Sequence, residues 1–201
     1  MEGLRRAAEG DAHEVAPLIL YAAPHLRVLL GGDHEAWHAA EACFRSDRTM
    51  FGHRWGMVAE AGGEVAGFVI AFPGRHWGSL KLGTGVTLAR AAGVKHAGDL
   101  VKRGRILDRL HPAPPREALY VSALAVHPRH RREGIATRLM ERAIAGADHL
   151  GLEVALDLDL DAEVPRKLYE GLGFAVVSER VAAGAERDLV ETPGFVRMVR
   201  R

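Results

Sequence analysis

The chain of 201 residues has very little cysteine, no long apolar run and almost no net charge. Its single cysteine, Cys43, cannot form an internal disulfide, which excludes a disulfide-stapled scaffold. No apolar stretch approaches the roughly 20 residues that cross a bilayer, and the N-terminus does not resemble a signal peptide. Lys and Arg number 27 against 26 Asp and Glu, so the net charge of +1 gives no reason to expect binding to nucleic acid or to an anionic membrane. We therefore expect a cytoplasmic protein.

Apolar residues make up 48% of the chain, enough to bury one sizeable core, and we predict a single domain over residues 1–201. Patterns typical of strands and of helices alternate along the sequence, which predicts an α/β fold. The predicted elements are a strand at 3–8, helices at 11–21 and 33–45, a β-hairpin at 53–72, a strand at 118–126, a helix after Pro128, a strand at 152–160, a helix within 164–174 and strands at 173–180 and 194–201.

The segment at about 74–116 is predicted to be a helical insertion ahead of the strand at 118–126. Its apolar spacing favours two modest helices, and "HPAPPRE" ends them because proline cannot continue a helix. The "GTG" at 83–85 is expected to break a helix. Four nearby aromatic residues are expected in the core, with the lining of a binding cleft as the alternative: Trp55, Phe68, Phe72 and Trp77.

The stretch "LAVHPRHRREGIATRL", 124–139, places a basic turn between an apolar strand and a helix. The first N–H groups of that helix have no intrahelical partner, and they lie at the positive end of the helix dipole. Gly134 and Ala136 leave room for a phosphate to approach the backbone, and Arg131 and Arg132 could neutralise its charge. The turn therefore predicts either a phosphate site or, equally, a solvated basic start of a helix.

The pattern Arg131-x-x-Gly134-x-Ala136 resembles the R/Q-x-x-G-x-G/A signature of the GNAT superfamily of acyl-CoA-dependent N-acetyltransferases. A second stretch, "KLYEGLGF" at 167–174, is similar to the L-Y-x-x-x-G-F segment that follows it in the same family. The resemblance is close over about 117–180, while the N-terminal half agrees only in the order of its elements. It implies a mixed, mostly antiparallel central sheet flanked by helices and splayed between the strands at 117–126 and 152–160.

The resemblance also implies that acetyl-CoA is the acyl donor. In the family, the signature amides hold the pyrophosphate of coenzyme A, and the preceding strand pairs with the pantetheine arm. The residues that would contact the cofactor are Leu124, Ala125, Val126, Arg131, Arg132, Glu133, Gly134, Ile135, Ala136 and Thr137.

Acyl transfer from a thioester to an amine needs a base for the amine, an acid for the departing thiolate and a donor to the carbonyl. Tyr169 matches the tyrosine that serves as general acid in the family, and an aromatic side chain of the helix core is the alternative. The resemblance assigns the carbonyl contact to the backbone N–H of Val126.

The general base is predicted on the strand at 152–160, because Tyr120 and Ser122 occupy the positions where some family members have a carboxylate. Asp157 lies where others have theirs, and the alternation of "ALDLDLD" puts it on one face with Asp159 and Asp161. Facing a cleft, these carboxylates would raise one another's pKa and attract a cationic amine. The alternative is a solvated strand face, with Glu117 or a chain of waters as the base.

One departure from the family pattern weakens the prediction of turnover. Ala162 stands where the family usually has an Asn that supports the cofactor arm, a role that Asp161 could take here. A non-catalytic acyl-CoA-binding module is therefore an alternative to an enzyme, although Tyr169 argues against it.

A competing motif, "HEAWH" at 34–38, fits the H-E-x-x-H pattern of zinc peptidases. The continuation found in metzincins is absent, and we predict an ordinary exposed helix whose Trp37 packs inward, with no metal bound.

The sequence leaves the acceptor open. A small amine, an antibiotic, an amino acid, and a protein lysine or N-terminus are all compatible with it. The insertion at 74–116 is expected to cover the acceptor side of the cleft, with a solvated surface or a dimer contact as alternatives. The family often dimerises, so a homodimer is also expected.

Overall fold

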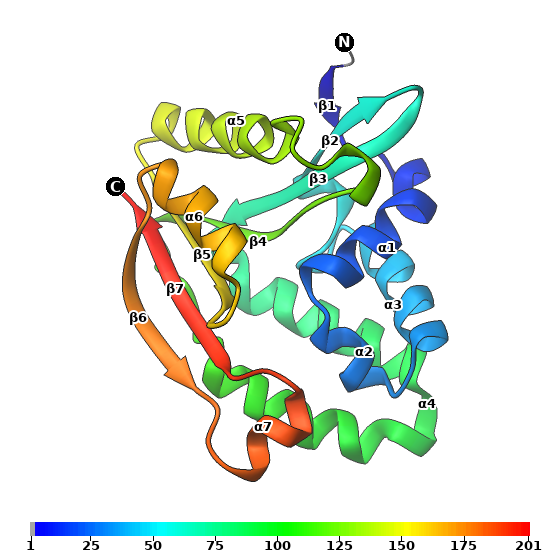
Figure 1. Ribbon diagram of the computed structural model, residues 1–201. Helices are drawn as coiled ribbons and strands as arrows, with labels where there is room; N and C mark the ends of the chain where they lie inside the picture. Colours follow the sequence, from blue (N-terminus) through cyan, green and yellow to red (C-terminus); the bar gives the residue numbers. More distant parts are fainter. Residues whose placement is uncertain (1–2) are drawn as a thin grey trace.

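A computed structural model describes residues 3–201, except for the side chains of residues 94–97. Seven strands form one sheet in the order β1-β2-β3-β4-β5-β7-β6 (Figure 1). Only the β4/β5 pair is parallel, and the other pairs are antiparallel. The predicted mixed, mostly antiparallel sheet is confirmed. The strands are β1 Leu4–Arg6, β2 Gly56–Ala61, β3 Glu64–Pro73, β4 Ala118–Val126, β5 Glu153–Asp159, β6 Ala175–Val181 and β7 Gly194–Arg200.

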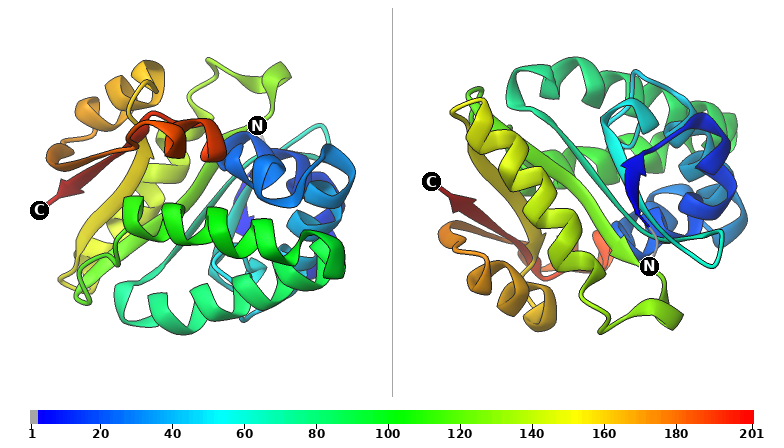
Figure 2. Two further views of the ribbon diagram at one scale, coloured as in Figure 1. Left: turned by 90° about the horizontal axis from the view of Figure 1, so that it is seen from below. Right: turned by 90° about the horizontal axis from the view of Figure 1, so that it is seen from above.

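Helices cover both faces of the sheet (Figure 2). One face carries α5 and α6, and the other carries α1, α3 and α4. No helix among the described residues is long and apolar enough to cross a membrane. The helices are α1 Ala12–Ala22, α2 His25–Leu30, α3 Asp33–Arg45, α4 Trp77–Leu110, α5 Ile135–His149, α6 Glu163–Gly171 and α7 Ala185–Val190.

The strand β4 is the centre of the core. Its run "ALYVSALAV" has almost no polar residue, as expected for a strand covered on both faces. Tyr120 packs with the core under α1 and α4, and Val121 packs with the core under α5. The apolar stripe of α5 completes that second core with Ile135 and Leu139, as its i, i+4 spacing predicts.

The insertion folds as one helical run, α4, bent at a single residue. Gly93 has φ 67° and ψ 176°, outside the helical region, so two helical halves meet there and lie side by side in Figure 2. The prediction that "GTG" breaks the helix is wrong. Gly83 lies against the main chain of Arg48, where a Cβ would be 1.9 Å from the carbonyl oxygen, and Thr84 accepts the N–H of Met50. Packing outweighs the weak helix propensity of glycine here.

Two short helices were not predicted from the sequence. The helices α2 and α7 have six residues each, too few for apolar periodicity to show. The loop that contains α2 follows Pro24 and places His25, Leu26 and Leu29 beside the sheet. This loop and α4 form two walls of the cavity beside β4 and β5.

Candidate active site

The two parallel strands β4 and β5 separate halfway along their length. Their register runs from Ala118↔Glu153 to Val121↔Leu156 and ends there. At this point β4 contains a bulge, because Ile70 pairs with Ala123 and Ala71 with Val121, which leaves Ser122 unpaired. The register thus bears out the predicted splay.

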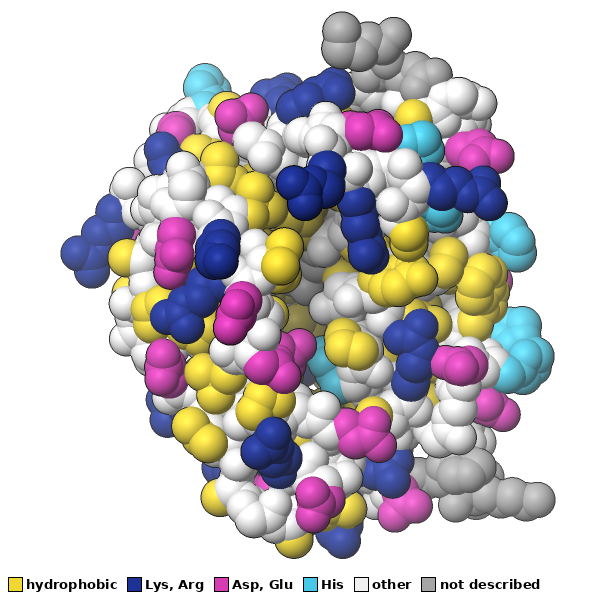
Figure 3. All heavy atoms as spheres, in the orientation of Figure 1, with side chains coloured by type: hydrophobic (Ala, Val, Ile, Leu, Met, Phe, Trp, Pro, Cys, Tyr) yellow, Lys and Arg dark blue, Asp and Glu magenta, His cyan; other side chains and the backbone are white. Residues whose placement is uncertain are grey.

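A cavity of about 620 Å³ fills the space where the strands diverge. It extends from this gap to α2 and to both halves of α4. Figure 3 shows a hollow near the centre of this face, with apolar side chains on its walls and Lys and Arg side chains along its upper rim. An elongated ligand can therefore lie in the gap while a second molecule approaches from the α4 side.

Beyond Val121, the edge of β4 that faces the gap pairs with no other strand among the described residues. The N–H of His127 donates to the carbonyl of Ala66 on β3, at 2.8 Å. Because main-chain groups alternate sides along a strand, the N–H and C=O of Leu124 and Val126 point away from β3 and into the gap. Arg131 Nε approaches the carbonyl of Val126 at 3.5 Å. The edge is available for an extended ligand to pair as an added strand.

The basic turn between β4 and α5 has the backbone of an anion site. After a short 3₁₀ turn at Pro128–His130, Arg132 and Gly134 adopt positive φ values of 67° and 76°, and α5 begins at Ile135. Left-handed residues in such a turn direct successive N–H groups into one concavity. A Cβ at Gly134 would meet nothing within 4 Å, so the space in front of the turn is open.

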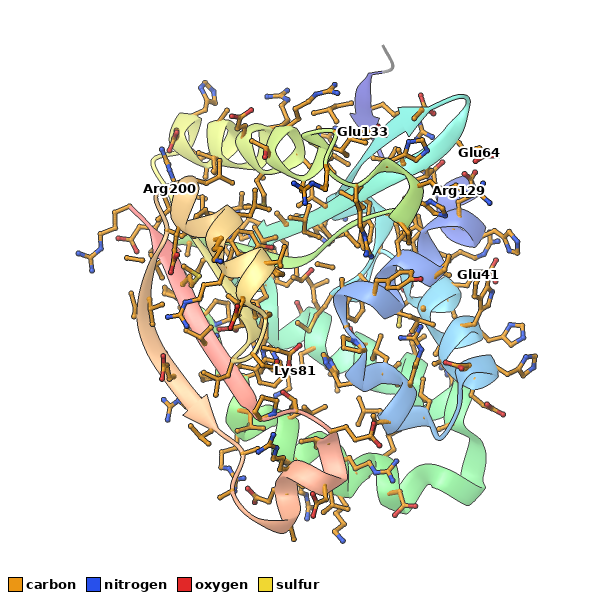
Figure 4. All side chains as sticks on the ribbon, viewed as in Figure 1. Glu41, Glu64, Lys81, Arg129, Glu133 and Arg200 are labelled. Carbon is orange, nitrogen blue, oxygen red and sulfur yellow. The ribbon has the colours of Figure 1, made fainter. Side chains whose placement is uncertain are left out.

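The predicted cofactor residues have different surroundings. The carbonyl of Ala125 faces Gly67 on β3, and the side chain of Ile135 is buried in the core, so Ile135 can offer a ligand only its N–H. The carboxylate of Glu133 lies 3.4 Å from Nδ1 of His130, and Figure 4 shows Glu133 at the top of the molecule. Of the remaining predicted contacts, Leu124 lines the cavity, Arg131 and Arg132 are exposed, and Ala136 and Thr137 lie in the first turn of α5.

Tyr169 lies on α6 and lines the cavity. Its ring is 7% exposed and packs edge-on against Phe174, with 5.7 Å between ring centroids. Burial raises the pKa of the Tyr169 phenol above its usual value, so the hydroxyl stays protonated at neutral pH. The residue therefore has both a core contact and an acidic group beside the gap.

Asp157 lies in the cavity wall, where it is part of a buried polar cluster. Arg197 on β7 donates to both of its oxygens, at 2.9 and 2.7 Å, and the hydroxyl of Tyr120 donates at 3.1 Å. The Nδ1 of His111 is 3.3 Å away. Burial would raise the pKa of Asp157, but the hydrogen bonds from His111 and Arg197 outweigh it and lower the pKa. A carboxylate held in this way is a weak base.

Asp159, two residues further along β5, has a different environment. The hydroxyl of Thr192 donates to its Oδ1 at 2.7 Å, and among the described residues no donor contacts Oδ2. Burial raises the pKa of Asp159, and the nearby charge of Asp161 raises it further, although the bond from Thr192 acts in the opposite direction. The expected mutual increase in pKa thus occurs at Asp159 and not at Asp157.

Comparison with known proteins agrees with this geometry. The model of the acetyltransferase (GNAT) family matches residues 25–174. The chain belongs to the GNAT family. No curated protein matches it in sequence.

Solved structures share the whole fold of this GNAT chain. An N-acetyltransferase from Staphylococcus aureus Mu50 has 18% identity and a TM-score of 0.77, and the match covers 98% of this chain and 99% of that one. A second acetyltransferase has 18% identity and a TM-score of 0.69, with 99% and 98% covered. The ribosomal-protein-S18-alanine N-acetyltransferase from Escherichia coli has 13% identity and a TM-score of 0.56, with 100% and 93% covered.

The acyl donor of GNAT acetyltransferases is acetyl-CoA, and the residues present fit it. The free edge of β4 suits the extended pantetheine arm, whose amides need main-chain partners. The turn at 131–134 presents N–H groups and two exposed Arg side chains to open space, as a pyrophosphate requires.

Among the described residues, the HEAWH motif of this GNAT chain and three of the four aromatic residues predicted for the core do not join the site. The rings of His34 and His38 are 4.5 Å apart on α3, and no three His, Cys, Asp or Glu side chains gather as a metal site among the described residues. Phe68 and Phe72 are core residues, and Trp55 packs against Phe72. Trp77 lines the cavity, so one of the four aromatic residues has the alternative role.

Sequence reasoning missed two partners in the site, His111 and Arg197. Arg197 is 40 residues from Asp157 but lies directly opposite it in the β5/β7 register. One feature of the sequence could have indicated this pair. The apolar strand "GFVRMV" contains a single Arg, and a buried Arg needs an acidic partner.

Proposed function

We propose that this GNAT protein transfers an acetyl group from acetyl-CoA to a primary amine by direct attack in the cavity between β4 and β5. The observation that carries the proposal is the position of Tyr169, a buried and protonated phenol on the wall of a gap whose other wall is the free edge of β4.

The chain would hold acetyl-CoA mainly through its backbone. The N–H groups of the turn at 131–134 and of the first turn of α5 would bind the pyrophosphate, with Arg131 and Arg132 supplying positive charge. The main-chain groups of Leu124 and Val126 would pair with the pantetheine arm. When bound, acetyl-CoA supplies an acetyl group activated as a thioester.

Two groups of the chain would assist the transfer. The N–H of Val126 points into the gap, where it can donate to the carbonyl oxygen as negative charge develops. The hydroxyl of Tyr169 can donate its proton to the sulfur as the C–S bond breaks. Its raised pKa keeps the proton in place until the thiolate forms.

The first test is titration calorimetry with acetyl-CoA and Gly134→Glu. Glu at residue 134 would be strained at a φ of 76° and would place a negative charge before the turn, so we expect binding about 100-fold weaker or undetectable. Gly146→Glu, within the helix that follows Gly134 and also facing open space, is the control and should bind as the native chain does. Equal binding by both variants would contradict the proposed cofactor site.

The second test is Tyr169→Phe. Loss of a general acid should lower kcat by about 100-fold, while the affinity for acetyl-CoA stays within about twofold because the ring and its contact with Phe174 remain. Unchanged turnover would remove the acid role from Tyr169. The homodimer and the cytoplasmic location stay predictions, which sedimentation and fractionation can test.

A further inference from the structure

The cavity extends past the splayed strands into a chamber on the far face of the sheet, with apolar walls. The helix α2 contributes Leu26 and Leu29, and the two halves of α4 contribute Trp77, Leu88 and Leu107. All five side chains are less than a tenth exposed. Such walls favour an apolar molecule and give peptide amides few partners, so a polypeptide acceptor would lose hydrogen bonds to water without replacement.

The charged residues of the cavity wall favour acceptors with a single amine. Lys81 and Asp108 neutralise each other across the two halves of α4, at 2.8 Å. Arg105 also borders the cavity. With Asp108 held by Lys81, a second or third ammonium group that reaches this part of the cavity would meet the positive charge of Arg105, which disfavours polyamines and polycationic antibiotics.

The acidic end of β5 provides the place for one amine. Asp157 is saturated by Arg197, Tyr120 and His111, whereas Asp159 keeps one carboxylate oxygen free of donors among the described residues. The negative charge of Asp161 lies nearby. A carboxylate attached next to the amine, as in an amino acid, would be repelled at this position.

We infer that the acceptor is a small primary monoamine on an apolar body, without a carboxylate next to the amine, and that its nitrogen is placed at Asp159. This inference rests on the proposed function. The ammonium group loses one proton to Oδ2 of Asp159, and the neutral nitrogen forms the C–N bond with the thioester carbon. As the C–S bond breaks, the nitrogen releases its second proton to water and Tyr169 protonates the thiolate. Asp159 then returns its proton to water and Tyr169 takes a proton back from water, so that one proton is released in all. The products are an N-alkyl acetamide and free coenzyme A.

The first experiment compares acceptors by release of free thiol from acetyl-CoA. The probes are phenethylamine, phenylalanine, spermidine and a tetrapeptide with a free Ala N-terminus. We expect kcat/KM for phenethylamine to exceed the other values by about tenfold or more, because each alternative leaves a charge or amides unpaired. Faster transfer to the peptide, to spermidine or to phenylalanine would overturn the inference while leaving the proposed acetyl transfer intact.

The second experiment decreases the volume of the chamber. Gly104 lines the cavity in the second half of α4, and a Cβ there meets nothing within 4 Å, so Gly104→Leu adds bulk without strain in the helix. We expect kcat/KM to fall about tenfold for phenethylamine and little for ethylamine. Gly78→Leu is the matched control, because Gly78 lies in the same helix, faces open space and does not line the cavity. An equal effect on both amines would count against a body-binding chamber.

The third experiment measures amine binding without acetyl-CoA, through the change in tryptophan fluorescence, to which Trp77 in the chamber wall contributes. Asp159→Asn keeps the acceptor for Thr192 but removes the charge, so the affinity for phenethylamine should fall about tenfold or more. The exposed Asp188→Asn is the control. If both variants bind phenethylamine as the native chain does, the amine is not placed at Asp159. Native protein that binds phenethylamine but not acetyl-CoA would instead show that the proposed function has failed.

Discussion

The cofactor half of the molecule, 118–174, and the helical half, 12–45 with 77–110, use different chemistry. In the cofactor half the proposed binding groups are main-chain N–H groups on a strand edge and a turn, with the charges of Arg131 and Arg132 beside them. A short motif therefore identifies the site. In the helical half the walls are apolar side chains, which can be exchanged as long as the volume is kept. No motif can mark such a pocket.

The cluster around Asp157 joins these two halves. Arg197 of β7 binds Asp157 of β5 and also donates to the carbonyls of Pro112 and Ala113, in the segment that leaves α4. The sheet and the end of α4 are thus tied by one side chain, which is 9% exposed. A variant at Arg197 therefore tests how strongly the two halves are connected.

The largest expected effect is that of Arg197→Met. It leaves the buried carboxylate of Asp157 without its cation, and the free energy of unfolding should fall by about 3–5 kcal/mol. The double variant Arg197→Met with Asp157→Leu should recover most of this loss, since no charge is left buried. Urea denaturation measures both. A loss below about 1 kcal/mol in the single variant would mean that the two halves are not joined through this cluster.

A smaller effect is expected inside α4, where two glycines differ. A Cβ at Gly83 would lie 1.9 Å from the carbonyl oxygen of Arg48, so Gly83→Ala should lower the free energy of unfolding by about 1–3 kcal/mol. At Gly104 a Cβ meets open space, and Gly104→Ala should raise it by about 0.5–1 kcal/mol. Thermal unfolding of the pair gives the comparison. Shifts of the same sign would show that packing does not distinguish the two positions.

An effect that appears only as the pH falls concerns His25 on α2, at the chamber wall. Burial and the nearby His111 lower the pKa of His25 to about 3, from 6.5. The unfolded chain therefore binds a proton below pH 6.5 that the folded chain does not, and stability is lost as the pH falls through this window. Between pH 6.5 and 5 the loss is at most ~1.4 kcal/mol per pH unit. His25→Gln should make the pH dependence of stability shallower. If the stability of the variant depends on pH as steeply as that of the native chain, His25 is not the cause of the pH dependence.

The sequence predicted more of the cofactor half than of the helical half for a physical reason. Gly134 and Tyr169 follow from local chemistry and from a motif; Gly134 has the positive φ of a tight turn before α5, and Tyr169 lines the cavity. Helix propensity, by contrast, could not predict that α4 bends at Gly93 and stays helical at Gly83 and Gly85, because all three residues are glycine. Of the three, only Gly83 packs against the main chain of Arg48, a contact that the sequence does not show.

The alternation of "ALDLDLD" by itself determined that Asp157 and Asp159 share a face of β5, because the side-chain period of a strand is two. It could not determine which carboxylate is free. That depended on Arg197 lying opposite Asp157 in the register and on Thr192 reaching Asp159, partners more than 30 residues away. Local pattern fixes the direction of a side chain, and the distant partners that set its charge and its chemistry are brought to it only by the tertiary fold.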